Sequence, residues 1–486
     1  MKESTDLRDL PRGWALTVLK ELVHHHSGNS NLIKGKMHKT PGPGLYPAFS
    51  ATGHDVWHDG YEHEGDVIIV SAVGARCGKC FLASGRWSAI ANTHVIWPIS
   101  EVADRRFLWY RINDENFWIR SGSAQPFVKV KDSLNLPFLV PPLDEQHRIA
   151  AKIEELFTKL DAGVEALRKV KAQLKRYRQA VLKHAFEGKL TQEWREAHKG
   201  ELEPASVLLE RIKEERKKTL GKKFKELPPV DTSTLPEPPE GWVWTRVREI
   251  SEFIQYGTSE KARNDPSGIP VVRMGDIQDG KLVFQNLKYF PADWPAQDDF
   301  VLQDGDVLFN RTNSAELVGK TAVYRSAHPR SVFASYLIRV RVNTEAYNPD
   351  ILALFINSYY GRRYITSVAS QQVGQANVNG TKLSLMPISL PSLPEQSKMV
   401  EEIERCLSVA DQVEKTAEQS LKQGDRFRQS ILKRAFEGKL VPQDPTDEPV
   451  SVLLERIKAE KEKPAPEEKP ARRRKRKSKP KQTRLI

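Results

Sequence analysis

The stretch Leu182-Lys-His-Ala-Phe-Glu-Gly-Lys-Leu190 returns 250 residues later as Leu432-Lys-Arg-Ala-Phe-Glu-Gly-Lys-Leu440, with one substitution. The residues before it recur in the same register, because Pro141-Pro-Leu-Asp-Glu-Gln146 matches Pro391-Ser-Leu-Pro-Glu-Gln396. Solenoid repeats have periods of about 20–50 residues, so two copies this far apart predict a two-fold-like architecture instead. A protein with that symmetry is suited to a two-part target.

A third pair of matching segments follows, Ser206-Val-Leu-Leu-Glu-Arg-Ile-Lys213 and Ser451-Val-Leu-Leu-Glu-Arg-Ile-Lys458. Ahead of these segments, apolar residues recur at intervals of three and four, as in a coiled-coil helix. In the first copy they are Ile149, Ile153, Leu156, Leu160, Val164, Leu167, Val170, Leu174, Tyr177 and Val181. The second copy repeats this stripe less regularly, between Ile403 and Ile431. Each copy therefore predicts one long helix with one apolar stripe.

The ends of these helices also carry signals. Gly188 and Gly438 stand where a glycine would end each long helix. Ser392-Leu-Pro-Glu395 predicts a capping box at the start of the second. Because each helix has one stripe to bury, its natural partner is the other helix. We expect an antiparallel coiled coil with one globular domain held near each end.

Two other segments, 12–140 and 242–390, have the composition of globular domains. Both open on Gly-Trp, at Gly13 and Gly241, and both are rich in glycine, proline, aromatic and β-branched residues. Short strands between Gly-rich turns predict mainly β or α+β domains. The expected divisions are a first globular domain at 1–140, a central helical repeat at 141–218, a proline-rich linker at 219–240, a second globular domain at 241–390, a C-terminal helical repeat at 391–463 and a disordered basic tail at 464–486.

Composition favours a soluble, cytoplasmic protein with an anionic partner. The chain has 486 residues, 29% of them charged, and a mean hydropathy of −0.54. No apolar run approaches the ~20 residues that cross a bilayer, and the N-terminus lacks the apolar segment of a signal peptide. Three cysteines argue against a disulfide framework. A net charge of +13 favours nucleic acid as the partner, and the basic tail adds phosphate affinity without sequence preference.

Together these features resemble the specificity (S) subunit of type I restriction-modification systems. The resemblance rests on Pro-x-Leu-x-Glu-Gln at 141–146 and 391–396, on the Ala-Phe-x-Gly-Lys-Leu helix ends and on the strand-turn pattern of the globular domains. A late segment, Gln371-Gln-Val-Gly-Gln-Ala-Asn-Val-Asn379, matches too. The resemblance covers nearly the whole chain except the basic tail. It implies an α+β, pseudo-two-fold fold, with two target recognition domains separated by two long helices that pair as an antiparallel coiled coil.

The resemblance also implies a function. Each globular domain would read one half of a bipartite sequence in double-stranded DNA, while the helices set the spacing and dock two modification (methyltransferase) subunits. Restriction (motor-nuclease) subunits would then join the complex. The chain itself would be non-catalytic and would hold no cofactor. The assembled complex would use S-adenosylmethionine, ATP and Mg²⁺ through its partner subunits.

Three alternatives stay open: a stand-alone restriction nuclease or DNA methyltransferase, the recognition subunit of another multi-subunit restriction class, and a coiled-coil scaffold without DNA preference. The Glu-Gly-Lys sequences at 187–189 and 437–439 resemble part of a nuclease site. Nuclease chemistry also requires acidic metal ligands nearby, whereas these sequences fall at predicted helix ends. No Asn-Pro-Pro-aromatic motif of an adenine methyltransferase is present.

A zinc site is a further alternative in the first domain. Cys77-Gly-Lys-Cys80 follows three histidines, His54, His58 and His63, and zinc prefers four nitrogen and sulfur ligands. Zinc ligands usually come in closer pairs, and the resemblance implies no metal here. We therefore expect an ordinary loop with packed thiols and no metal.

DNA contacts follow from the chemistry of each side chain. Arginine pairs with guanine and Asn or Gln with adenine, whereas phosphates require only cations or donors. For reading bases, the second domain offers Arg311, Asn313, Gln371, Gln372, Gln375 and Asn377. For binding phosphates it offers Lys261, Arg263 and Lys382. In the first domain we select His24, His26, Lys34, Lys36, Lys39, Arg76 and Lys79. The alternative for each is a solvated loop residue. Phe186 and Phe436 are the predicted partner-interface residues.

Overall fold

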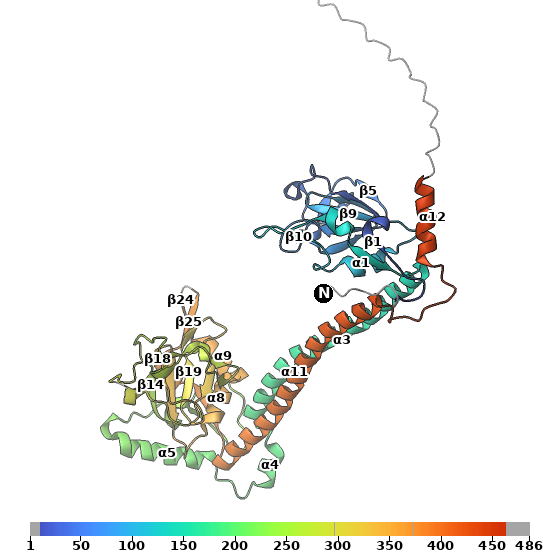
Figure 1. Ribbon diagram of the computed structural model, residues 1–486. Helices are drawn as coiled ribbons and strands as arrows, with labels where there is room; N and C mark the ends of the chain where they lie inside the picture. Colours follow the sequence, from blue (N-terminus) through green and yellow to red (C-terminus); the bar gives the residue numbers. More distant parts are fainter. Residues whose placement is uncertain (1–9, 296, 373, 463–486) are drawn as a thin grey trace, which may run out of the picture. The chain divides into compact units, whose positions relative to one another are not determined.

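The computed structural model describes residues 10–295, 297–372 and 374–462, and the predicted basic tail at 464–486 lies outside them. The chain forms two compact units, one of residues 1–165 with 421–486 and one of residues 166–420. Each unit combines an α+β domain with parts of the two long helices, α3 (Leu143–Phe186) and α11 (Leu393–Phe436) (Figure 1). The predicted α+β class, with two globular domains and two long helices, is confirmed.

The first domain is built on two four-stranded sheets. One has the order β2 (Val23–Ser27), β9 (Thr93–Pro98), β6 (Val67–Ser71), β7 (Cys80–Ala83) and is antiparallel throughout. The other has the order β4 (Gly53–His58), β3 (Tyr46–Ser50), β8 (Arg86–Ala89), β5 (His63–Glu64). Around them lie β1 (Ala15–Val18), η2 (Leu19–Glu21), η3 (Lys34–Lys36), α1 (Arg105–Ile112), β10 (Arg120–Ser121), β11 (Phe127–Val128), α2 (Val130–Leu134) and β12 (Pro137–Val140).

The second domain repeats this plan. Its main sheet has the order β14 (Ser251–Tyr256), β23 (Leu337–Val342), β19 (Val307–Asn310), β21 (Thr321–Val323). Smaller sheets contain β15 (Ile269–Val272), β16 (Ile277–Gln278), β17 (Lys281–Leu282), β18 (Lys288–Phe290), β20 (Thr312–Asn313), β22 (Val332–Phe333), β24 (Ser370–Gln372) and β25 (Gln375–Asn377). The remaining elements are β13 (Val243–Arg246), α6 (Val247–Ile250), η5 (Met274–Asp276), α7 (Gln297–Phe300), α8 (Pro349–Asn357), α9 (Tyr359–Val368), α10 (Gly380–Ser384) and β26 (Pro387–Leu390).

The repeated Pro-x-Leu-x-Glu-Gln sequence joins each domain to its long helix. In the first copy, the indole Nε1 of Trp14 donates to Glu145 (3.0 Å), and Gln146 accepts from the backbone N–H of Asp104 (2.8 Å), the residue that caps α1. The glutamine also donates to two backbone carbonyls. Glutamate and glutamine are both buried, at 1% and 0% exposure. The first turn of α3 therefore holds the start of the domain and its helix together.

The second copy makes the same joint. Trp242 donates to Glu395 (2.7 Å), and Gln396 accepts from the N–H of Asn348 (2.7 Å), which caps α8. The predicted capping box at Ser392 is wrong, because the hydroxyl of Ser392 is buried without a hydrogen-bond partner in the described chain. The carboxylate that would complete the box bonds to the tryptophan instead. A buried tertiary contact has displaced a local one.

The two joints differ in one respect. Glu395 also accepts from Thr191 (2.7 Å) and from Arg195 (2.6 Å) on α4 (Gln192–Ala197). Glu145 has no counterpart of these donors, and one of its carboxylate oxygens is buried without a hydrogen-bond partner in the described residues. Burial raises the pKa of Glu145, although the hydrogen bond from Trp14 and the charge of Arg148 act in the opposite direction.

Within each unit the two long helices run antiparallel. In the first unit, Arg428 of α11 pairs with Asp161 of α3. In the second, Arg178 of α3 pairs with Asp411 of α11 at 2.7 Å. These two pairs are the same pair in the repeat, because both residues shift by 250 positions. The predicted antiparallel pairing is confirmed in each unit.

The glycine predictions at the helix ends are also confirmed. Gly188 and Gly438 have φ of +67° and +69°, the left-handed region that favours glycine. In the first copy, Gly188 N–H donates to Ala185 O and Lys189 N–H to His184 O (both 2.9 Å), which is a Schellman motif. Each Glu-Gly-Lys sequence belongs to such a cap, and its two charged side chains form an ion pair.

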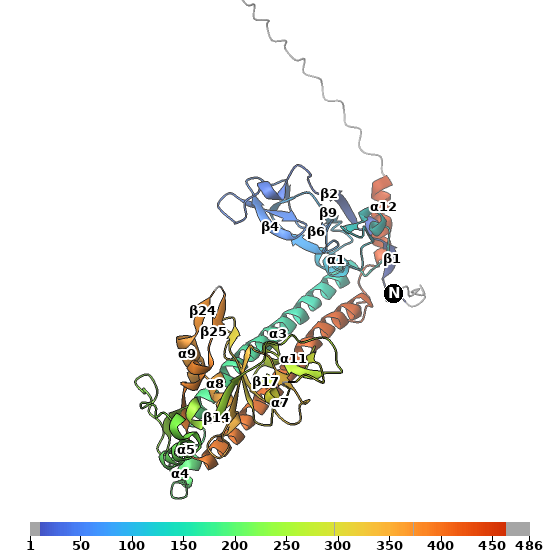
Figure 2. The ribbon, with the colours of Figure 1, turned by 90° about the vertical axis from the view of Figure 1, so that its left-hand side faces the viewer.

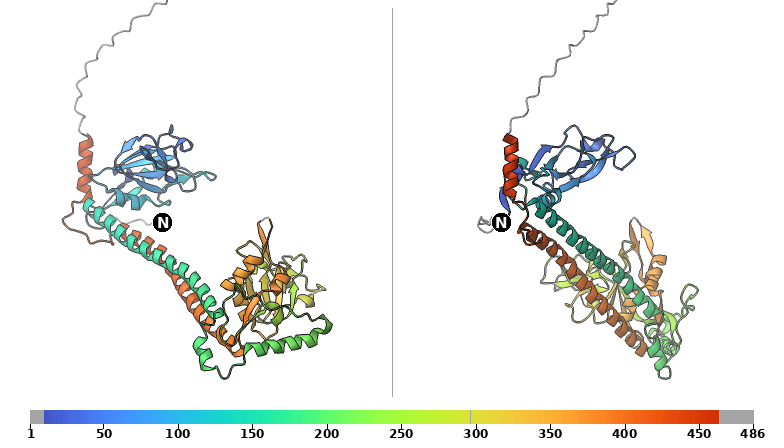
Figure 3. Two further views of the ribbon diagram at one scale, coloured as in Figure 1. Left: turned by 180° about the vertical axis from the view of Figure 1, so that it is seen from behind. Right: turned by 90° about the vertical axis from the view of Figure 1, so that its right-hand side faces the viewer.

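Each unit is completed by a short helix. In the second unit α5 (Ala205–Leu220), followed by η4 (Gly221–Lys223), buries Leu208 and Ile212 in the domain core. In the first unit the same role falls to α12 (Val450–Glu462), the red helix next to the first domain in Figure 3. This helix buries Val450 and Leu453. The two helices begin in the same way: Ala205 N–H donates to Gly241 O, and Val450 N–H donates to Gly13 O. No helix in the described part of the chain is both long and apolar enough to cross a membrane.

The two glutamates of the joints should respond differently to neutralisation. We expect Glu395→Gln to lower the free energy of unfolding by about 3–5 kcal/mol, because it leaves Arg195 without its buried counter-charge. Glu145→Gln should leave stability at pH 7 unchanged or raised. Chemical unfolding of both variants at pH 7 measures this difference, and an equal loss in both would contradict it.

The pH dependence of the free energy of unfolding follows from the same comparison of Glu145 with Glu395. The folded-state pKa of Glu145 lies above its ordinary value of 4.5. Its contribution to stability is therefore fully present below about pH 4.5 and is lost as the pH rises through the raised pKa. Glu145→Gln should remove this contribution from the stability profile, whereas Glu395→Gln should leave it in place.

Candidate nucleic-acid interface

The two domains can be compared position by position, because four backbone hydrogen bonds recur in both. In the first domain they are Gly28 N–H to Thr93 O, Ala72 N–H to Asn92 O, Gly78 N–H to Ser71 O and Val128 N–H to Ala72 O. In the second domain the equivalent bonds, in the same order, are Gly257 N–H to Leu337 O, Arg311 N–H to Tyr336 O, Gly319 N–H to Asn310 O and Val378 N–H to Arg311 O. All eight lie at one end of the main sheet, which we call the loop end. Some equivalent residues there are identical, such as Gly78 and Gly319, whereas others differ, such as Ala72 and Arg311.

The second domain gathers its predicted base-reading residues at this loop end. The strand β20 (Thr312–Asn313) pairs with β25, and β25 pairs with β24, in a three-stranded sheet. The structure thus brings together two segments that the sequence separates by about sixty positions. The hairpin of β24 and β25 projects from its domain (Figure 2). On it, Gln371 and Gln375 are exposed, Gln372 lies on β24, and Asn377 donates to Thr312 (2.6 Å).

Arg311 lies at the base of this sheet. Its guanidinium stacks over the ring of Tyr256, with 5.0 Å from Cζ to the ring centroid. The hydroxyl of Tyr256 accepts from Gly380 N–H (2.6 Å) and so connects β14 with α10. The Nε atom of Arg311 is buried without a hydrogen-bond partner in the described chain. The arginine is therefore held by stacking, and no acidic residue in the described part of the chain forms an ion pair with it.

The predicted phosphate-binding residues of the second domain lie on two other segments of the chain. Lys261 and Arg263 are exposed and follow β14, and Lys382 lies half-buried on α10. None of the three side chains forms an ion pair or a hydrogen bond with the described residues. Arg263 is fixed through its backbone, which exchanges hydrogen bonds with Tyr289. Unpaired cations are available to an anionic partner.

In the first domain, the predicted residues fall into three places. His24 and His26 lie on β2, Lys34, Lys36 and Lys39 lie on and after η3, and Arg76 and Lys79 lie in the turn between β6 and β7. Only the turn belongs to the loop end. The Lys34 side chain is bound within the first domain, because its ammonium forms an ion pair with Asp55 and donates a hydrogen bond to Thr52 (2.7 Å).

Of the two predicted histidines, His24 is exposed on β2 and His26 has structural partners. His26 accepts from the indole of Trp97 (3.0 Å) and packs beside His63, with ring centroids 5.1 Å apart. His94 packs near His25, and burial lowers the pKa of His94 to about 4. The imidazole of His94 is therefore neutral at physiological pH and supplies no charge for a phosphate.

The cysteines of the possible zinc site are packed thiols. Cys77 and Cys80 are free and buried, and Sγ of Cys80 lies 3.4 Å from the carbonyl of Ile112. Burial raises the pKa of Cys80 strongly, which opposes the thiolate that zinc binds. Among the described residues, no three His, Cys, Asp or Glu side chains come together as metal ligands.

Phe186 does not have the exposure of a partner-interface residue. It is 1% exposed and packs edge-to-face on Phe355, with ring centroids 5.0 Å apart, inside its own unit. Phe436 is partly buried against Phe107 (5.9 Å). The recurrence of this phenylalanine is therefore explained by domain packing. Phe427 and Tyr177, equivalent residues of the long helices, are exposed by 59% and 43%.

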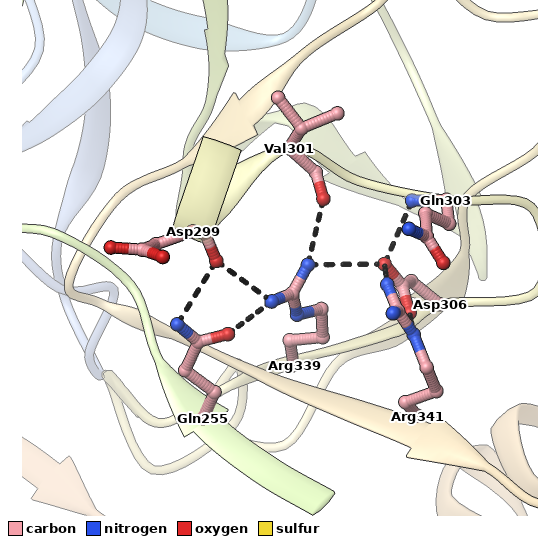
Figure 4. Close-up of polar contacts among 7 residues, drawn as sticks. All are labelled: Gln255, Asp299, Val301, Gln303, Asp306, Arg339 and Arg341. Atoms are coloured by element: carbon pink, nitrogen blue, oxygen red, sulfur yellow. Dashed lines mark hydrogen bonds and ion pairs between the residues drawn. The ribbon is translucent and has the colours of Figure 1, made fainter. Parts of the chain in front are cut away.

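A buried ionic cluster links β23 of the second domain to the loop that precedes β19 (Figure 4). Asp306, 1% exposed, accepts from Arg341 (2.8 Å) and lies 3.4 Å from Arg339. Arg339 also donates to the carbonyls of Asp299 (3.0 Å) and Val301 (2.8 Å) and so fixes the loop that precedes β19. The register of the sheets places Val67 and Val95 at the positions of Asp306 and Arg339.

Sequence reasoning missed several residues at the loop end. In the first domain the hairpin of β10 and β11 corresponds to β24 and β25, because Val73 bridges to Phe127 as Thr312 pairs with Asn377. This hairpin carries exposed Gln125. The sequence did contain a signal for Gln125, because it lies 250 positions before Gln375, the offset of the repeat. Exposed Tyr256 and Tyr336, and the half-buried Lys320, were missed as well.

Comparisons with known proteins match this architecture. The model of the type I restriction modification DNA specificity domain matches residues 11–176 and 239–423. The EcoKI specificity subunit of Escherichia coli is 28% identical over 68% of this chain, and the StySPI specificity subunit of Salmonella potsdam is 27% identical over 68%. The chain spans 64% of the length of each. The EcoDI specificity subunit of Escherichia coli is 25% identical over 93% of this chain and 96% of its own length.

Two solved structures share the fold. The HsdS subunit from Thermoanaerobacter tengcongensis has a TM-score of 0.54 at 18% identity and covers 90% of this chain and all of its own. A chain from a study of complex assembly and conformational transition of the type I R-M system has a TM-score of 0.58 at 18% identity, covering 89% of this chain and all of its own.

The ionic cluster generates a prediction. Asp306→Asn should lower the free energy of unfolding of the second domain by about 3–5 kcal/mol, because it leaves two guanidiniums without their buried counter-charge. The matched control is Asp304→Asn, an exposed carboxylate in the same turn, which should cost less than about 1 kcal/mol. Urea unfolding measures both variants, and hydrogen exchange at 299–303 should rise only in the first. Equal losses would contradict this role of Asp306.

Proposed function

This chain belongs to the family of type I restriction modification DNA specificity domains, and we propose that it directs a DNA-modifying complex to a bipartite DNA sequence. Each globular domain reads one half of that sequence through the loop end of its main sheet. The observation that carries the proposal is the sheet of β20, β25 and β24, which joins Arg311 with the amides of Gln371 and Gln375. Guanidinium and amide groups are the ones that distinguish base pairs in the major groove.

The comparison of the two domains supports two different half-sites. Both hold their loop ends with the same backbone hydrogen bonds, yet Ala72 stands where the second domain has Arg311. Phe127 likewise stands where the second domain has Asn377. Because the two domains share these backbone hydrogen bonds, their base-reading side chains are positioned alike. Because the side chains differ, the two domains have different base preferences.

The chain acts without chemistry of its own in this proposal. Two modification (methyltransferase) subunits dock on it, and motor-nuclease subunits join them. S-adenosylmethionine, ATP and Mg²⁺ are used by these partners. Exposed Phe427 and Tyr177, at equivalent places on the long helices, suit the docking of two copies of one partner better than the buried Phe186.

Selection from a randomised duplex library tests the proposal, with the full chain alone and with its methyltransferase partner. We expect a split motif of two short fixed halves and an unread spacer, sharpened by the partner. Gln375→Ala should relax one half only, and Gln125→Ala the other half only, each by about 1–3 kcal/mol per base pair. The control is Gln278→Ala, an exposed glutamine of β16 outside the three-stranded sheet.

Two results would contradict the proposal. The absence of any split motif with the partner present would favour a scaffold or a stand-alone enzyme, which assays of cleavage and methyl transfer then separate. A split motif in which Gln375→Ala relaxes both halves would show that the domains do not divide the reading.

A further inference from the structure

One feature of the loop end is shared by both domains down to the side chain. Gly78-Lys79 and Gly319-Lys320 occupy the same place, between β6 and β7 and between β19 and β21. Gly78 N–H donates to Ser71 O, and Ser71 N–H donates to Lys79 O (both 2.8 Å). This is the pattern of a G1-type β-bulge, in which a glycine and the next residue face one residue of the neighbouring strand.

The second domain forms the same bulge. Gly319 N–H donates to Asn310 O (2.7 Å), and Asn310 N–H donates to Lys320 O (2.9 Å). The glycines have φ of +94° and +83° in the two domains, values that L side chains rarely adopt. The backbone therefore explains why a glycine recurs at this position.

The fold does not explain the lysine. The side chains of Lys79 and Lys320 are half-buried and form neither an ion pair nor a hydrogen bond with the described residues. The residue opposite the bulge is also unusual in both domains. The hydroxyl of Ser71 and both amide atoms of Asn310 are buried without hydrogen-bond partners in the described chain, at a cost of about 1–3 kcal/mol per group. A turn selected for stability alone would avoid that cost.

The bulge lies directly beside the surface assigned to base reading. The residue after Ser71 is Ala72, whose carbonyl accepts from Val128 N–H at the end of β11. The residue after Asn310 is Arg311, whose carbonyl accepts from Val378 N–H after β25. In both domains, then, the residue facing the lysine is followed directly by the residue whose carbonyl binds the end of the hairpin, β10–β11 in the first domain and β24–β25 in the second.

Two readers of different half-sites share one ligand, the phosphodiester backbone. We propose that Lys79 and Lys320 are equivalent phosphate-binding residues, one in each domain, that contact the DNA backbone beside the bases read by the neighbouring sheet. This inference rests on the proposed function. A side chain that recurs between otherwise different domains, without a role in folding, binds what the two half-sites have in common. Lysine suits this role, because a phosphate requires a point charge and no particular base.

Salt dependence of binding tests the inference on the duplex selected by the wild-type chain with its methyltransferase partner. The slope of log K against log salt changes by about 0.9 for each phosphate contact. Lys79→Gln and Lys320→Gln should each reduce the slope by about that amount, and the double variant by about twice it. The selected sequence should stay the same. Lys79→Arg and Lys320→Arg should restore the slope, because arginine keeps the charge.

The matched control is Lys217→Gln, an exposed lysine of α5 that should leave the slope unchanged. Thermal unfolding of the Lys79 and Lys320 variants should match the wild type, because neither lysine side chain has an ion-pair or hydrogen-bond partner among the described residues. An unchanged slope in the double variant, or an altered base preference in either half, would overturn the inference. A wild-type chain that selects no split sequence would instead refute the proposed function, so the two failures are distinguishable.

Discussion

The architecture depends on two consecutive polar side chains buried in the first turn of each long helix. Glutamate and glutamine, at 145–146 and 395–396, hold the tryptophan that opens a domain and the backbone that caps its helix. Buried polar groups are costly unless they are hydrogen-bonded, and these hydrogen bonds form only in one arrangement of the groups. Such a pair therefore specifies one orientation of domain on helix, where an apolar contact would tolerate several. Recognition at a defined place on DNA requires that orientation to be fixed.

Within the globular domains, equivalent interior positions are filled by residues of different chemistry. The position that holds Asp306 and Arg339 in the second domain holds Val67 and Val95 in the first. A buried ion pair in the second domain and an apolar pair at the same positions in the first support the same strand order. The interior can thus drift while the loop end keeps its backbone frame. This separation allows the residues at the loop end to change without rebuilding the fold.

The repeat made most of this predictable from the sequence. A 250-residue offset identified the long helices and their glycine ends, and the shared Gly-Trp openings and composition identified the two globular domains as equivalent. It could not show that Phe186 packs inside its own unit, because an apolar residue at a helix end suits a core and an interface equally well. Nor could it show that Lys34 is held by Asp55, or that Glu395 leaves its capping box for a tryptophan. Those outcomes depend on residues that are distant in sequence.

The composition of the first unit also bears on how the protein is made. Its core includes Phe107 and Trp14 together with Ala435, Val450 and Leu453. A ribosome adding about 5–20 residues per second synthesises the first domain some 15–60 seconds before those last residues emerge. During that interval an apolar face of the nascent domain is uncovered and open to chaperones or to misassembly. In the second unit, which is continuous in sequence, the globular domain is followed directly by the helix residues Met399 and Ile403 of its core.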